Sequence, residues 1–130
     1  MNASYRDLKV WQRSMKLALS IYATTSQFPK QELYGLVSQM RRAAVSIPSN
    51  IAEGKGRITD RDRVHFYAQA RGSLLELETQ ILIAQQLNYV SLSNAETLLQ
   101  LSSEIGRMLN GLVEAISGHA THQRYTASQA

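Results

Sequence analysis

The side chains that could bind a metal ion or carry out catalysis are few in this sequence, and their spacing does not form a known site. Metal sites in helical bundles often use a glutamate with a histidine three residues later, and none of the seven glutamates has one. Asp62 and His65 have this spacing once, and His119 and His122 lie in a polar C-terminal segment. The chain has no cysteine, which excludes disulfides and thiolate chemistry. We therefore expect no catalytic residues, no metal, no cofactor and no small-molecule substrate.

Basic residues are concentrated in the first half of the chain. The net charge is +4, from 14 lysines and arginines against 10 aspartates and glutamates, and 12 of the 14 lie in residues 1–71. Phosphate backbones bind lysine and arginine, so this distribution favours RNA or DNA as a partner. The candidate residues lie on one stripe of the first helix and around the connection between the second and third helices: Arg6, Lys9, Arg13, Lys16, Lys55, Arg57, Arg61 and Arg63. A solvated face that serves solubility alone is the alternative, since Asp60 and Asp62 partly neutralise the set.

Apolar residues recur at steps of three and four along the whole chain, which predicts four helices and no strands. The first runs over about 7–26, and the second starts near Glu32, is kinked rather than ended by Pro48, and is closed by Gly54 and Gly56. The third follows Thr59 as N-cap, and a capping box at 93–96 starts the fourth, which ends near Gly118. We predict an all-α fold, an antiparallel up-down-up-down four-helix bundle over 1–118 followed by a polar, disordered tail over 119–130. An irregular helical array is the alternative.

The first two helices each have a second apolar face. On the first helix we expect Leu8, Trp11, Met15, Ala18, Leu19 and Tyr22 to face the core, while other apolar residues form a separate arc. A helix that is apolar on two sides usually contacts a structural element on each side. We therefore predict a homo-oligomer whose interface contains Val10, Leu17, Ile21, Tyr34, Arg41 and Val45. A single broad core face is the alternative.

Three segments of the sequence resemble a known family. They are YRDLKVW at 5–11, QMRRAAVSIPSNIAEG at 39–54 and ARGSLLELET at 70–79. Together they resemble the bacterial four-helix bundle proteins named for intervening sequences in 23S ribosomal RNA genes. The resemblance implies a four-helix bundle and a homopentamer, and it implies no defined activity. The accessory proteins of diversity-generating retroelements are similar in fold; they are basic and pentameric and work with a reverse transcriptase and nucleic acid.

These observations lead to one functional hypothesis and one alternative. No apolar run approaches the roughly 20 residues that a membrane span needs, and the first residues lack the apolar core of a signal peptide, so we expect a cytoplasmic protein without membrane contact. We expect it to be non-enzymatic and homo-oligomeric, and to bind RNA or DNA through a basic end. The alternative is a protein-binding scaffold that makes no contact with nucleic acid.

Overall fold

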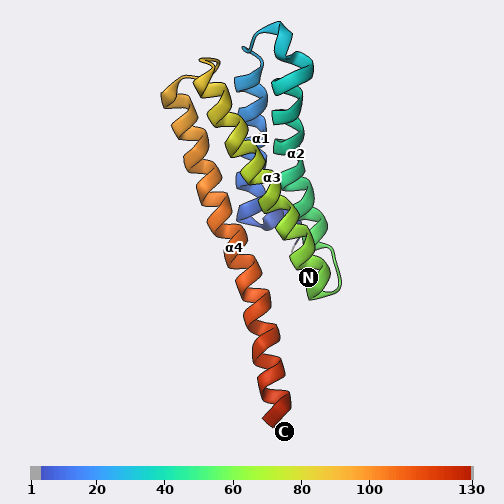
Figure 1. The fold of residues 1–130 in the computed structure, drawn as a ribbon. Coiled ribbons are helices and arrows are strands. Elements are labelled where there is room, and N and C mark those ends of the chain that lie inside the picture. Colours follow the sequence, from blue (N-terminus) through green and yellow to red (C-terminus); the bar gives the residue numbers. More distant parts are fainter. Residues whose placement is uncertain (1–3, 130) are drawn as a thin grey trace.

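Four helices form an all-α bundle in the computed structural model, which describes residues 4–129 and the side chains of residues 4–118. The long helices are α1 (Lys9–Thr25), α2 (Ser38–Lys55), α3 (Asp60–Gln86) and α4 (Leu92–Gln129). Consecutive helices lie side by side and alternate in direction, as the up-down-up-down prediction requires, and α4 continues past the end of the other three (Figure 1). The division into a bundle over 1–118 and a tail over 119–130 stays a prediction, because the side chains of the tail lie outside those described.

Short helical turns connect or precede the long helices. A 3-10 turn η1 (Tyr5–Asp7) leads into α1, and a 3-10 turn η2 (Lys30–Glu32) is followed by a π-helical turn η3 (Leu33–Val37) before α2. The second helix was therefore predicted to begin too early. Gly35 in η3 has the non-helical dihedrals φ −108° and ψ −109°, which separate this turn from the regular helix. Pro48 lies inside an unbroken α2, so it does not end the helix, as predicted.

Side-chain caps set the starts of α3 and α4. Thr59 accepts a hydrogen bond from the backbone amide of Asp62, which confirms it as the N-cap of α3. The predicted cap of α4 was two residues too late. Ser91, and not Ser93, accepts the hydrogen bond from the amide of Asn94 (3.1 Å), because the helix already begins at Leu92. Each cap provides a partner for an amide that has none within the first turn of its helix.

The core confirms the predicted apolar stripe of α3 and corrects the prediction for α1 in part, since Ala18 is buried and Leu8 and Trp11 pack against the core as expected. The α3 residues Tyr67, Ala70, Leu74, Leu77, Ile81 and Ala84 are all buried. In α1 the buried arc contains Val10, Leu17 and Ile21, with exposed fractions of 3% or less. Leu19 and Tyr22, which were expected in the core, are 66% and 44% exposed. The predicted interface residues Val10, Leu17 and Ile21 are thus core residues of the chain itself.

Small polar residues explain why the wrong arc of α1 was assigned to the core. Ser14 and Thr25 lie on the buried arc, which makes this arc more polar in sequence than its neighbour. The hydroxyl of Ser14 donates to the carbonyl of Val10 (2.7 Å), and that of Thr25 donates to the carbonyl of Ile21 (2.6 Å). Since each hydroxyl is satisfied within its own helix, its burial carries little penalty. Tyr22 is exposed instead, whereas Trp11 is partly buried and packs against the core.

Polar contacts also join α3 to its neighbours. Ser46 and Ser73 share a hydrogen bond between α2 and α3 (2.8 Å), and the buried Ser102 of α4 donates to Glu78 of α3 (2.6 Å). Among the described side chains, Glu76 and Glu78 form no ion pair with an arginine. These contacts between helices are therefore made mainly by serine hydroxyls.

Candidate interaction surfaces

An apolar groove runs along the outside of the bundle between α1 and α2. Its upper part is a hollow of about 600 Å³ next to η3, and its lower part extends toward η1. Tyr22 and Val45 line both parts, so the two hollows adjoin each other. We call this surface the α1/α2 groove. Its apolar lining is Trp11, Met15, Ala18, Leu19, Tyr22, Leu33, Tyr34, Val37, Val45, Pro48 and Ala52.

Two of the predicted interface positions lie in this groove with large apolar exposure. Tyr34 is 93% exposed and Val45 is 41% exposed. The α1 wall of the groove was missed, because Leu19 and Tyr22 had been assigned to the core. The width of the apolar surface of α1 could have revealed this wall. A bundle of this size can bury only one arc of such a helix, so the other arc stays exposed. A second apolar arc on α1 was thus predicted correctly, but Leu19 and Tyr22, assigned to the core, belong to the exposed surface.

Arg41 is held against the α1 side of the groove. Its Nε donates to Thr25 Oγ1 (3.0 Å), and its guanidinium lies 4.6 Å from the centroid of the Tyr22 ring. A weaker contact of 3.4 Å joins one terminal nitrogen to the carbonyl of Tyr22. The side chain is therefore ordered before any partner binds, which lowers the entropy lost on association.

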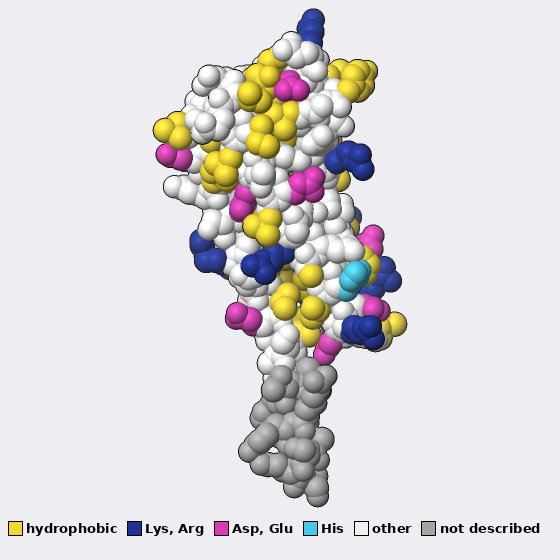
Figure 2. Space-filling view, viewed as in Figure 1, with side chains coloured by type: hydrophobic (Ala, Val, Ile, Leu, Met, Phe, Trp, Pro, Cys, Tyr) yellow, Lys and Arg dark blue, Asp and Glu magenta, His cyan; other side chains and the backbone are white. Residues whose placement is uncertain are grey.

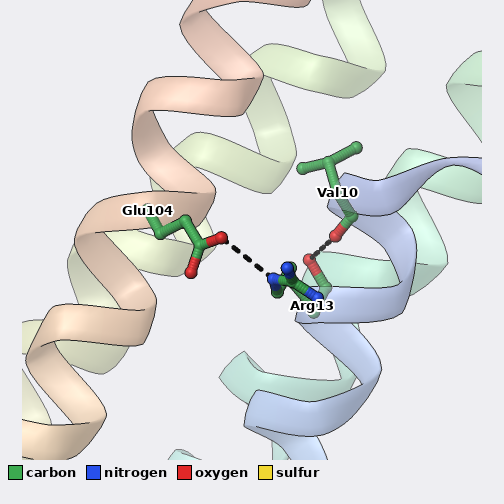
Figure 3. Close-up of polar contacts among 4 residues, drawn as sticks. Val10, Arg13 and Glu104 are labelled. Atoms are coloured by element: carbon green, nitrogen blue, oxygen red, sulfur yellow. Dashed lines mark hydrogen bonds and ion pairs between the residues drawn. The ribbon is translucent and has the colours of Figure 1, made fainter.

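The basic end of the bundle unites two separate parts of the sequence. The start of α1 and the α2–α3 connection lie at the same end (Figure 1). Six of the eight candidate residues belong there, namely Arg6, Lys9, Lys55, Arg57, Arg61 and Arg63. Arg13 and Lys16 lie further along α1, and Arg13 Nε pairs with Glu104 Oε1 of α4 at 2.9 Å (Figure 3). The predicted basic stripe of α1 therefore borders α4 and reaches the basic end only at its first residues.

Acidic neighbours neutralise part of the basic end. Arg57 pairs with Glu53 (3.3 Å) and stacks on Phe66, with its guanidinium 4.4 Å from the ring centroid. Arg63 pairs with Asp60 (2.8 Å). Within the described part of the chain, Lys55 and Arg61 are exposed and form no ion pair. Arg6 and Lys9 at this end are likewise exposed and absent from the ion pairs of the described residues, so these four side chains are the ones most available to a phosphate.

At this end of the bundle, the environment of Tyr67 shifts the pKa of its hydroxyl. Burial raises the pKa of its hydroxyl above the ordinary value of 10, and the positive charge of Arg63 offsets part of this rise. The ring packs directly against the backbone of Gly54 at the end of α2. Tyr67 therefore packs between α3 and the end of α2. This contact holds the two helices together beside the α2–α3 connection, which the basic residues Lys55 and Arg61 flank.

The described residues show no grouping of three potential metal ligands. His65, of the Asp62 and His65 pair, instead contacts Gln69, with 3.0 Å between the two Nε2 atoms. His119 and His122 lie outside the described side chains. None of the helices over residues 4–129 combines the length and the apolar character required to cross a membrane.

The comparison with known families matches residues 6–111 to the family described as 23S rRNA-intervening sequence protein. The chain belongs to this family. The 23S rRNA-intervening sequence family match covers all of α1, α2 and α3 and more than half of α4, so both surfaces described above lie within it. No curated protein matches the chain.

A solved structure supports the fold of this 23S rRNA-intervening sequence family member. It is a crystal structure from Bacteroides thetaiotaomicron VPI-5482, described as a protein with unknown function from the S23 ribosomal protein family. The TM-score is 0.73 at 21% identity, and the similarity covers 81% of this chain and 98% of that chain. At this identity the similarity extends to the four-helix fold alone.

Proposed function

We propose that the chain is a non-enzymatic protein that assembles with copies of itself and contacts RNA or DNA through its basic end. The observation that carries the proposal is the α1/α2 groove, where Leu19 is 66% and Tyr34 is 93% exposed. Apolar surface removed from water contributes about 25 cal/mol per Å². An open groove lined mostly by apolar side chains therefore favours association. A homopentamer is the assembly that the family resemblance implies.

Sedimentation velocity of purified protein tests the assembly. The wild-type chain should sediment as a multiple of its 14.5 kDa mass, and Leu19→Glu should sediment as a monomer. Ile58→Glu is the matched control, because Ile58 is 91% exposed but lies outside the groove. This control should assemble like the wild type. A wild-type chain that stays monomeric at tens of micromolar would rule out self-assembly.

The nucleic-acid part of the proposal rests on Lys55 and Arg61. Both are exposed and flank the α2–α3 connection, Lys55 at the end of α2 and Arg61 in the first turn of α3. Repetition in an assembly would multiply the number of phosphate contacts. The logarithm of affinity falls with the logarithm of salt concentration, with a slope of about 0.7 per phosphate contact for single strands. Losing two contacts should therefore reduce the slope by about 1.4 per bound chain.

Binding of a labelled single-stranded RNA and a DNA duplex, measured at several salt concentrations, tests this part. Lys55→Ala/Arg61→Ala should weaken binding and flatten the salt dependence. Lys30→Ala/Arg107→Ala removes the same amount of positive charge away from the basic end. This control should change the affinity and the salt dependence much less. Wild-type protein that binds neither probe at low salt would contradict the nucleic-acid proposal.

A protein-binding scaffold is the second candidate. The ion pairs of Arg57 with Glu53 and of Arg63 with Asp60 favour it, because they weaken the positive field at the basic end. An assembly that forms normally but binds no nucleic acid at low salt would support this function instead.

A further inference from the structure

The α2–α3 connection presents one apolar side chain to solvent among basic residues. Ile58 is 91% exposed. Lys55 and Arg61 lie three residues before and three residues after it, and both are exposed and form no ion pair within the described residues. Figure 2 shows hydrophobic side chains next to basic and acidic ones at this end of the bundle, close to a histidine. A single exposed apolar side chain is common on protein surfaces, and the surroundings of Ile58 are what distinguish it.

The residues on both sides of Ile58 are held in place. The amide of Arg57 donates to the carbonyl of Gly54 (3.2 Å), and its guanidinium lies over the ring of Phe66. Thr59, which follows Ile58, is the N-cap of α3. The β-branched side chain of isoleucine also has few rotamers. Ile58 is thus fixed at the tip of the connection before any partner binds, which lowers the entropy lost on binding.

The aromatic rings at this end of the bundle are already in contact with other side chains. The guanidinium of Arg57 lies 4.4 Å from the ring centroid of Phe66. Tyr67 is buried, and Tyr5 packs edge-on against Trp11 with 5.3 Å between the ring centroids. Proteins that bind single strands stack the unpaired bases on exposed aromatic rings. These contacts leave little aromatic surface for such stacking, which favours a double helix over a single strand as the partner.

An apolar tip between two cations matches the minor groove of duplex DNA. The groove is about 6 Å wide, and the phosphates of the two strands line its two edges. Three residues of chain span at most about 11 Å, so Lys55 and Arg61 can reach phosphates on the two sides while Ile58 enters the groove. Proteins that bend DNA insert isoleucine and similar side chains as wedges between base pairs and partly unstack them.

We infer that Ile58 inserts between two base pairs of a DNA duplex while Lys55 and Arg61 contact the flanking phosphates. This inference rests on the nucleic-acid binding proposed above and names the ligand as double-helical DNA. Pyrimidine–purine steps are the most easily unstacked, so we expect the insertion to favour them.

A DNA duplex with 2-aminopurine at a central TA step tests the insertion, because this adenine analogue becomes brighter when it unstacks. Wild-type protein should raise the fluorescence, and Ile58→Ser should not. Ile58→Ser should also weaken binding by about tenfold or more, since an apolar contact is lost. The salt dependence should stay the same, because no charge is removed.

Leu92→Ser is the matched control and should behave like the wild type. Leu92 is 62% exposed, but it lies at the α3–α4 connection, at the opposite end of the bundle (Figure 1). The circular dichroism of Ile58→Ser should match that of the wild type, because the side chain is exposed. Should Ile58→Ser unfold, Ile58→Thr takes its place, since threonine keeps the β-branch.

Three other outcomes would overturn the inference, and they are distinguishable. If the wild type and Ile58→Ser bind the duplex and give the same fluorescence, Ile58 does not insert, and the proposed nucleic-acid binding stands without it. Tighter binding to a single-stranded RNA than to the duplex, or binding to phosphatidylglycerol vesicles and not to the duplex, would assign Ile58 to another partner. Wild-type protein that binds neither the duplex nor the single strand at low salt would remove the proposed nucleic-acid function itself.

Discussion

The ring of Tyr67 lies so close to Gly54 that a Cβ atom at residue 54 would come within 2.7 Å of Tyr67 Cε1 and 2.9 Å of Tyr67 Cδ1. It would also lie 3.1 Å from the Cβ of Phe66. Tyr67 is 3% exposed, so its ring cannot move aside into solvent without disturbing the core. Glycine at residue 54 is therefore required by close packing between α2 and α3, at the end of α2 from which the basic connection departs.

Gly54→Ala should destabilise the fold, because the added methyl group displaces a buried ring. Overpacking of this kind typically costs about 1–3 kcal/mol. Urea denaturation followed by circular dichroism measures the change in the free energy of unfolding. Gly111→Ala is the control, since no atom lies within 4 Å of its added Cβ and the residue is inside α4. This control should leave stability unchanged or raise it by up to about 1 kcal/mol. Equal effects of the two substitutions would contradict the packing argument.

Leu17→Ala and Leu19→Ala should separate the two faces of α1. Leu17 is 0% exposed, so removing its side chain leaves a cavity and should cost about 2–5 kcal/mol of stability. Leu19 is 66% exposed, and its truncation should change the stability of the monomer by no more than about 0.5 kcal/mol. Chemical denaturation at a protein concentration where the chain is monomeric measures both. A larger loss for Leu19→Ala would mean that Leu19 and not Leu17 faces the core.

The raised pKa of Tyr67 predicts a loss of stability at alkaline pH. Burial favours the neutral hydroxyl, so the folded state holds this proton to a higher pH than the unfolded chain, whose tyrosines titrate near pH 10. This contribution is fully present below about pH 10 and is lost as the pH rises through the raised pKa. Urea midpoints measured from pH 8 to pH 11 should fall less steeply in Tyr67→Phe than in the wild type. Parallel pH profiles would exclude Tyr67 as a source of the alkaline effect.

The ion pair between Arg13 and Glu104 should contribute little to stability despite its short distance of 2.9 Å (Figure 3). The two side chains are 44% and 40% exposed, and exposed pairs are typically worth about 0–1 kcal/mol because water and salt screen them. A double-mutant cycle with Arg13→Ala and Glu104→Ala should give a coupling energy within that range at low salt. The coupling should shrink further in 1 M salt. A coupling above about 2 kcal/mol would show that the pair is a major link between α1 and α4.

Much of the fold could be predicted because local patterns are strong in a helical chain. Helix α3 has a single apolar stripe from Tyr67 to Ala84, and Thr59 has a side chain suited to capping. The structure confirms both the buried stripe and the cap. The start of α2 was wrong because Gly35 departs from helical geometry within a turn whose spacing still looks helical. The cap of α4 was wrong because Ser91 and Ser93 offer the same hydroxyl chemistry two residues apart.

The sequence determined the helical class of the protein, the number of long helices and the presence of two apolar arcs on α1, because all three follow from residue spacing within one segment. Only the tertiary structure decided which arc of α1 is buried. Val10, Leu17 and Ile21 pack in the core beside Ser14, whose hydroxyl is satisfied by its own helix, while Leu19 and Tyr22 line the groove. Burial depends on how side chains from several helices fill a shared volume, and the apolar content of one arc does not contain that information.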